Sequence, residues 1–133
     1  MDADEVLAFL RKAGDDQIRD AVHAFGTEGV LELVFRGMAD RFGMRPGRSP
    51  GLIVFELDDD GTEHRHGVRV TEGGATHLHD PQEDARATVR TTVVRFCRVA
   101  VGSQDPKRLV VTRRLTIGGD MVWAVATLAS LKR

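Results

Sequence analysis

The chain has 133 residues, of which 41% are hydrophobic and 29% are charged, and its formal net charge at pH 7 is -1. This length suits one domain, over residues 1–133, that buries about two-thirds of its unfolded surface. A net charge this small gives no general attraction to phosphates, so we expect no nucleic-acid partner. The single cysteine, Cys97, excludes an internal disulfide and is expected in the core.

The chain shows no sequence signal for membrane insertion or secretion. Apolar runs such as 51–55 fall far short of the ~20 residues that a spanning helix needs, and residues 1–5 lack the basic region of a signal peptide. We therefore expect a cytoplasmic protein, with transient membrane contact left open. Only three of its 19 basic residues are lysines, and this bias toward arginine suggests a bacterial source.

The first 43 residues predict three helices. The first opens near Asp4 and ends at Gly14, and the second is capped by Asp15 or Asp16 and ends at Gly26. The third begins at the following threonine and is ended by the loop from Pro46 to Pro50. It carries the richest apolar stripe of the chain, made of Val30, Leu31, Val34, Phe35, Met38 and Phe42.

A three-stranded meander is predicted next. Its strands are residues 52–57, a segment through Val68 and Val70, and a segment that ends at His79. The two turns are predicted at 58–61 and at Gly73–Gly74. This second turn would place Val70 opposite His77 and Val68 opposite His79.

The last third alternates strands and helices. A strand at 87–91 leads to a helix that is capped by Thr91 or Thr92 and ends at Gly102, and Asp105 with Pro106 opens a short helix to Val111.

A closing strand and helix follow. Alternating residues predict a strand at 114–117, and Gly118–Gly119 form a turn. Asp120 caps the closing helix, whose expected inward face is Met121, Val125, Leu128 and Leu131.

This order of elements, with the segments 87–89, 101–102, 105–106, 115–117 and 119–120, resembles the sterol carrier protein 2 family over about residues 30–131. The resemblance implies a single α+β domain. Helices would pack on one face of a mixed, mostly antiparallel five-stranded sheet and enclose an apolar tunnel. Residues 27–133 would form this core, and residues 1–26 would add two helices. Many members carry a glycine where Arg113 stands and an acidic residue where Arg86 stands, both at positions that we expect to be exposed.

The family resemblance implies noncatalytic binding and transfer of a fatty acid, acyl-CoA, sterol or related lipid in the tunnel. Burial and shape hold such a ligand, so no catalytic residue, cofactor or metal is expected. The expected lining comes from three helices: Phe35, Met38, Phe42, Val93, Phe96, Met121, Trp123, Val125 and Leu128. Without the family, the same residues would be read as an ordinary core.

Two alternatives remain open at this stage. The pocket could serve a bacterial biosynthetic pathway as a tailoring enzyme, a cyclase or isomerase, with His66 and His79 as acid-base residues, or as an accessory protein. The first two helices could instead form a homodimer or partner surface.

Four histidines alternate on the second hairpin, which places all of them on one side of the sheet. A zinc site is conceivable there, but the sequence favours a solvated face because the ligands are expected to spread along the ribbon without a cysteine. The histidines are His64, His66, His77 and His79.

Overall fold

The computed structural model describes residues 3–43 and 49–130. Helices and strands occur in the order that the sequence predicts. They are α1 (Ala3–Lys12), α2 (Asp15–Phe25), α3 (Thr27–Gly43), β1 (Gly51–Asp59), β2 (Thr62–Thr71), β3 (Gly74–His79), β4 (Ala87–Thr92), α4 (Val93–Ala100), α5 (Pro106–Val111), β5 (Thr116–Gly119) and α6 (Met121–Ala129).

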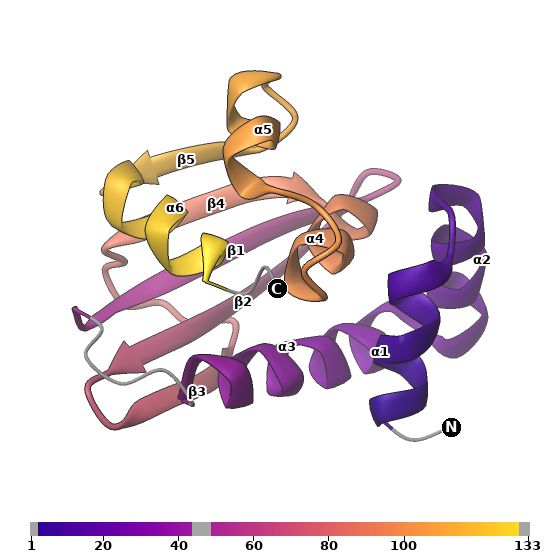
Figure 1. Cartoon of the computed structure of the whole chain (residues 1–133), viewed down its shortest axis with the longest axis horizontal. Coiled ribbons are helices and arrows are strands. Elements are labelled where there is room, and N and C mark those ends of the chain that lie inside the picture. The colour runs from indigo at the N-terminus through magenta and orange to yellow at the C-terminus, as the bar shows by residue number, and fades with distance from the viewer. Residues whose placement is uncertain (1–2, 44–48, 131–133) are drawn as a thin grey trace.

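The five strands form one mixed sheet in the order β3-β2-β1-β4-β5. The β1–β4 pair is parallel and the other three pairs are antiparallel. The crossover between the parallel strands contains β2 and β3, which extend the sheet to one edge, so the chain returns to the sheet centre before it adds β4 (Figure 1). This arrangement confirms the predicted α+β class and the mixed, mostly antiparallel sheet.

The helices gather on one face of the sheet. Figure 1 shows α3 passing along the β3 side, α5 and α6 beside β5, and α1 and α2 at one end next to α4. Alternate residues of β1, Ile53, Phe55 and Leu57, point to the same side of the sheet and are fully buried under this layer. The core therefore lies between the sheet and α3, α4 and α6.

The opposite face of the sheet carries ion pairs that join three strands. The Arg65 guanidinium donates to Glu56 Oε2 at 2.6 Å, and Arg90 pairs with the other oxygen of the same carboxylate. Glu56 lies on β1 between these two partners on β2 and β4. The charged row occupies only part of this face, because Leu52 and Val54 lie on the same side of β1 and are buried.

The three N-terminal helices are confirmed, with one change at a cap. Gly14, rather than Asp15 or Asp16, is the N-cap of α2, and the Gln17 side chain accepts a hydrogen bond from the Gly14 N–H at 2.8 Å. The two aspartates lie inside the first turn, where carboxylates favour the positive end of the helix dipole. Residues 44–48, most of the expected Pro46–Pro50 loop, lie outside the described part of the chain.

The first hairpin turns at Asp60–Gly61, whose φ angles of 49° and 95° are those of a tight turn matched to strand twist. The second turns at Glu72–Gly73, because Thr71 pairs with Gly74. The turn that we predicted at Gly73–Gly74 therefore lies one residue too far along the chain. The partners predicted for β2 on β3 are wrong by two residues, since His77 pairs with Val68 and not with Val70. Since a shift of two keeps side chains on the same face, the four histidines still share one side of the sheet.

The caps of the later helices are confirmed. The Thr92 hydroxyl accepts from the Arg95 N–H at the start of α4, and the Asp105 carboxylate accepts from the Lys107 N–H with Pro106 at the first position of α5. The Asp120 carboxylate accepts from the Trp123 N–H at 3.1 Å and starts α6.

The last strand and helix differ from the prediction in their placement. Gly118 and Gly119 belong to β5 and pair with Thr88 and Ala87, so they do not form a turn. The inward face of α6 consists of Trp123, Ala124, Thr127 and Leu128, whereas Met121 is 46% exposed. The predicted stripe was therefore rotated around the helix, and its last member, Leu131, lies outside the described residues.

Arg113 and Arg86 show what the two departures from the family pattern mean. Arg113 is exposed and has a φ of 60°, a left-handed conformation that glycine adopts without strain. Arg86 is half-buried and pairs with Asp120, so the expectation that it is simply exposed is wrong.

Within residues 3–43 and 49–130, none of the helices has the length and apolar character needed to cross a bilayer.

Candidate functional site

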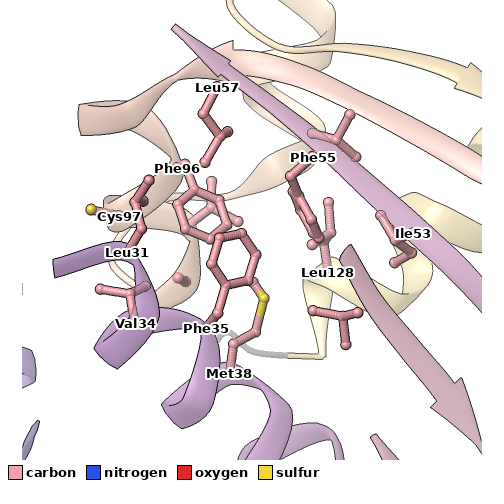
Figure 2. Packing of buried hydrophobic residues seen from close by; sticks show 14 of the residues in the cluster. Leu31, Val34, Phe35, Met38, Ile53, Phe55, Leu57, Phe96, Cys97 and Leu128 are labelled. Carbon is pink, nitrogen blue, oxygen red and sulfur yellow. The ribbon is translucent and has the colours of Figure 1, made fainter. Parts of the chain in front are cut away.

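Most of the residues predicted to line a tunnel meet in the centre of the core. Figure 2 shows side chains from α3, α4 and α6 gathered around Phe55 of β1. The members that are at most 8% exposed are Phe35, Met38, Phe42, Val93, Phe96, Trp123 and Leu128. The structure thus brings together seven of the nine, with Val125 partly buried beside them and Met121 at the surface.

Aromatic rings occupy the space between α3, α4 and the sheet. The Phe35 ring lies 4.6 Å from Phe96 and 5.3 Å from Phe55, measured between centroids, and Phe96 lies 5.3 Å from Phe55. These separations are those of packed aromatic pairs. The side chains therefore fill this part of the core, and their role in ligand binding stays a prediction.

Cys97 lies in the same core and is fully buried. Burial raises the pKa of its thiol to about 12, so the thiolate needed for nucleophilic chemistry is not formed near neutral pH. The expectation of a small core residue is confirmed.

A set of polar contacts fixes the start of α6. The Arg86 guanidinium pairs with Asp120 at 3.0 Å and lies 4.4 Å from the Trp123 ring centroid, and the Trp123 indole N–H donates to the Ser49 carbonyl at 2.9 Å. The hydrogen bond from the Trp123 N–H and the contact with Arg86 hold the pKa of Asp120 below its usual value. This end of α6 is anchored to the segments that directly precede β1 and β4.

An apolar pocket of about 240 Å³ opens between α1, α2 and α3. Phe9 and Phe25 form part of its wall and are 39% and 62% exposed. Gly29 on α3 adds open space, because a Cβ at this position would meet nothing within 4 Å. The full lining is Val6, Phe9, Leu10, Ala21, Val22, Phe25, Gly29, Val30 and Leu33.

The sequence prediction missed this pocket, although part of its signal was present. Val6 and Leu10 stand four residues apart in α1, and Val22 and Phe25 stand three apart in α2, a spacing that predicts an apolar face on each helix. Spacing along each helix shows that these faces exist, but it does not show that the helices splay enough to leave a space between them.

A polar junction lies at the turn between β1 and β2. His23 on α2 contacts the Asp59 carboxylate at 2.9 Å, and the Thr27 hydroxyl donates to the same carboxylate at 2.8 Å. The hydrogen bond to Asp59 raises the pKa of His23. These contacts connect the end of α2 and the start of α3 to the sheet.

A cluster of histidines lies on the helix-facing side of β2 and β3. His66 is 1% exposed, and its Nδ1 lies 2.9 Å from His77 Nε2. Glu28 of α3 reaches the cluster, with its Oε2 3.0 Å from His66 Nε2 and 2.7 Å from His64 Nδ1. The predicted solvated face is therefore wrong, because α3 covers this side of the sheet at His66.

The surroundings of the cluster set the protonation of His77 and of Glu28, the carboxylate that contacts it. Burial, together with the charges of His66 and His79, lowers the pKa of His77 to about 4, so this imidazole is neutral at pH 7. Partial burial would raise the pKa of Glu28, but the hydrogen bonds from His66 and His64 outweigh it and hold that pKa below its usual value. Glu28 is therefore ionised and accepts both contacts.

Solved structures of known proteins share this fold. Sterol carrier protein 2 like 2 from Aedes aegypti matches with a TM-score of 0.62 and 11% identity, covering 77% of this chain and 97% of that protein. A. aegypti sterol carrier protein 2 in complex with palmitate matches with a TM-score of 0.59 and 15% identity, covering 74% and 94%. At these identities the likeness establishes the fold, which is that of the sterol carrier protein 2 class and confirms the resemblance.

A sequence model of the family described as MycE methyltransferase N-terminal matches residues 6–108, and the chain belongs to this family. The match includes α2 and most of α1, so the family pattern extends through the two N-terminal helices. The curated proteins contain no match to the sequence.

The fold also occurs inside a larger enzyme. The sec-alkylsulfatase Pisa1 from Pseudomonas sp. matches with a TM-score of 0.53 and 13% identity over 63% of this chain. The chain spans 13% of the length of that sulfatase. The likeness therefore concerns one part of the enzyme and shows the fold alone.

Proposed function

We propose that this protein binds an apolar ligand without transforming it, and that the pocket between α1, α2 and α3 receives the hydrocarbon part of that ligand. The observation that carries the proposal is the pocket itself: about 240 Å³ of space lined only by apolar side chains and one glycine. Ligand pockets are concave and mostly apolar, and this volume is slightly below the ~300–1,000 Å³ of sites for drug-sized molecules. A hydrocarbon chain is the chemistry that such a lining favours.

Burial of the hydrocarbon chain supplies the main favourable free energy of binding. About ten methylenes transferred from water contribute ~8 kcal/mol at ~0.8 kcal/mol each. This is the scale of micromolar affinity before the entropic cost of association is subtracted. Exposed Phe9 and Phe25 at the rim lose solvent contact when a ligand enters, which adds to the gain.

The comparisons support the class of ligand. One structure with this fold is a complex with palmitate, and another is a palmitated sterol carrier protein from the same insect. The family of this chain is named for the N-terminal part of a methyltransferase. The palmitate-bound structures and the family description together favour a domain that holds an apolar substrate for a biosynthetic enzyme over a domain that itself catalyses a reaction.

The core residues around Phe35 remain a second location for the same function. A ligand there would have to displace the packed rings of Phe35, Phe55 and Phe96 or move α6 away from the sheet. The anchor at Arg86, Asp120 and Trp123 opposes such movement. The pocket of α1–α3 requires neither change, and it is therefore the site that we propose.

Displacement of a fluorescent fatty acid tests the proposal. Gly29→Leu fills the pocket from a position where an added side chain meets open space, so binding should fall at least about tenfold, a change of about 1.4 kcal/mol. Gly29→Ala is the matched control and should bind within about twofold of the parent. Leu128→Ala, on the buried face of α6, tests the core location, because a ligand held in the core would contact this side chain and change its affinity in this variant, whereas a ligand in the pocket of α1–α3 would not.

Two results would overturn the proposal. One is equal affinity of Gly29→Leu and the parent chain. The other is the absence of extractable lipid and of fatty-acid binding, combined with a dimer in sedimentation that Phe25→Asp dissociates. The second result would assign the apolar surface of α1 and α2 to a second copy of the chain.

Participation in a tailoring reaction is the alternative for this family. The methyltransferase name favours a biosynthetic setting, but neither His66 nor His79 lines the apolar pocket. His66 is buried against Phe35, with ring centroids 4.8 Å apart. If these histidines served as acid-base residues, His79→Ala would abolish turnover and leave ligand affinity unchanged.

A further inference from the structure

Three histidines from two adjacent strands converge on one point. His66 on β2 is paired with His79 on β3, and His77 lies two residues before His79 on the same face of the strand. One ring nitrogen from each of the three lies within 4.8 Å of the others. The expectation that the histidines spread along the ribbon is therefore wrong for these three.

The contact with Glu28 decides which nitrogen of His66 is available. An ionised carboxylate only accepts hydrogen bonds, so His66 Nε2, at 3.0 Å from Glu28 Oε2, carries the proton. The Nδ1 lone pair then points to His77 Nε2, 2.9 Å away. A histidine that donates its second ring N–H to a carboxylate is the usual arrangement around protein-bound metals.

The surroundings restrict the rings but leave access from solvent. The Phe35 ring stacks on His66 and His77, with centroid separations of 4.8 and 4.9 Å and interplanar angles of 23° and 2°. These stacks limit rotation of both imidazoles. His79 is exposed on β3, which is an edge strand, so an ion can reach the three nitrogens from that side.

We propose that His66, His77 and His79 form a binding site for a divalent transition-metal ion of the zinc type, with Glu28 as the residue that orients His66. Neutral imidazole is a good ligand for Zn²⁺, Co²⁺, Ni²⁺ and Cu²⁺. Three histidines with the fourth position open to water is also a known zinc ligand set. The ion would take the place of the hydrogen bond between His66 Nδ1 and His77 Nε2, and the neutral His77 imidazole would then carry its proton on Nδ1.

A zinc site requires an adjustment of the three imidazoles, whose ligand nitrogens lie within 4.8 Å of one another. With zinc–nitrogen bonds of about 2.0–2.1 Å, ligand nitrogens in a tetrahedral site lie about 3.3 Å apart. The His66–His77 separation of 2.9 Å would widen by a few tenths of an ångström, and His79 would move inward from an exposed position. His64 also contacts Glu28, but it does not belong to the converging group.

Zinc titration of the tag-free chain tests the site, with a chromophoric chelator as competitor and Co²⁺ absorption as a second probe of coordination. We expect one ion per chain. His79→Ala should weaken zinc binding by more than the ~10–100-fold expected for Glu28→Gln, which removes only the orienting charge. His79 is exposed on an edge strand, so this variant should retain the parent circular dichroism spectrum.

His23→Ala is the matched control, because His23, Asp59 and Asp60 form another group whose ligand atoms lie within 4.8 Å of one another. Zinc affinity should be unchanged in this variant. Loss of binding in His23→Ala, or equal affinity of His79→Ala and the parent, would overturn the proposal. Fatty-acid displacement measures the separate apolar pocket, so the two proposals can fail independently.

Discussion

The C-terminal helix α6 and the N-terminal helices α1 and α2 carry large apolar residues, but these residues lie in different surroundings. At α6, Trp123 and Leu128 pack into the core, and Arg86 and Asp120 fix the first turn. Between α1 and α2, Phe9 and Phe25 remain largely exposed around a pocket. The apolar side chains of the first region are buried and stabilise the fold. Those of the second region remain exposed around the pocket that we propose as the ligand site.

This difference shows why apolar content alone does not locate a binding site. The richest apolar residues lie under α3, α4 and α6, where they fill the interior at close contact distances. Close packing leaves little room for a ligand unless an element moves. A site is more readily formed where helices meet without complete interdigitation, as α1, α2 and α3 do.

Truncation of one aromatic residue in each region should give the largest contrast. Trp123→Ala removes a side chain that is 8% exposed and should lower the free energy of unfolding by about 3–5 kcal/mol. Phe25→Ala removes one that is 62% exposed and should change it by less than about 0.5 kcal/mol. Urea unfolding followed by circular dichroism measures both. Similar losses in the two variants would contradict the distinction between the regions.

Two glycine-to-alanine substitutions should have opposite signs. Gly119 has a φ of 84°, and a Cβ there would lie 2.5 Å from the Arg86 carbonyl oxygen, so Gly119→Ala should destabilise by about 1–3 kcal/mol. Gly29 lies in a helix with open space around it, so Gly29→Ala should stabilise by about 0.5–1 kcal/mol. Midpoints of thermal unfolding distinguish the two. A loss of stability in Gly29→Ala would show that the pocket wall is already packed.

The smallest expected effect is on the pH dependence of stability, to which Asp120 at α6 and His23 at α2 contribute in opposite directions. The pKa of Asp120 is lowered in the folded state, so its contribution is present above the unfolded value near 3.9 and is lost as pH falls further. The pKa of His23 is raised, so its contribution is present below about 6.5 and is lost as pH rises through the folded value.

Matched variants separate these contributions. Asp120→Asn should reduce the loss of stability between pH 5 and 3, whereas His23→Gln should reduce the loss between pH 6 and 8. A nuclear magnetic resonance titration of the His23 imidazole should have its midpoint above 6.5. A midpoint below that value would contradict the contact with Asp59.

Local rules predicted most of the elements because their signals are local. Thr92, Asp105 and Asp120 cap helices through hydrogen bonds to residues two or three positions away, which spacing alone reveals. The β2–β3 register was missed because the turn could be made by Gly73–Gly74 or by Glu72–Gly73, and neighbouring strands decide between them. The inward face of α6 was missed because the helix is apolar on most sides.

The sequence by itself determined the order of helices and strands and that four histidines share a face of the β2–β3 hairpin, whereas the mixed sheet with helices on one face was implied by the family resemblance. Periodicity and capping are properties of neighbouring residues, so they survive without a structure. Only the tertiary structure decided that α1, α2 and α3 leave an apolar pocket and that Glu28 meets His66 across 38 positions of the chain. Both depend on how whole elements pack against one another, and this packing is a balance over many residues that no single segment contains.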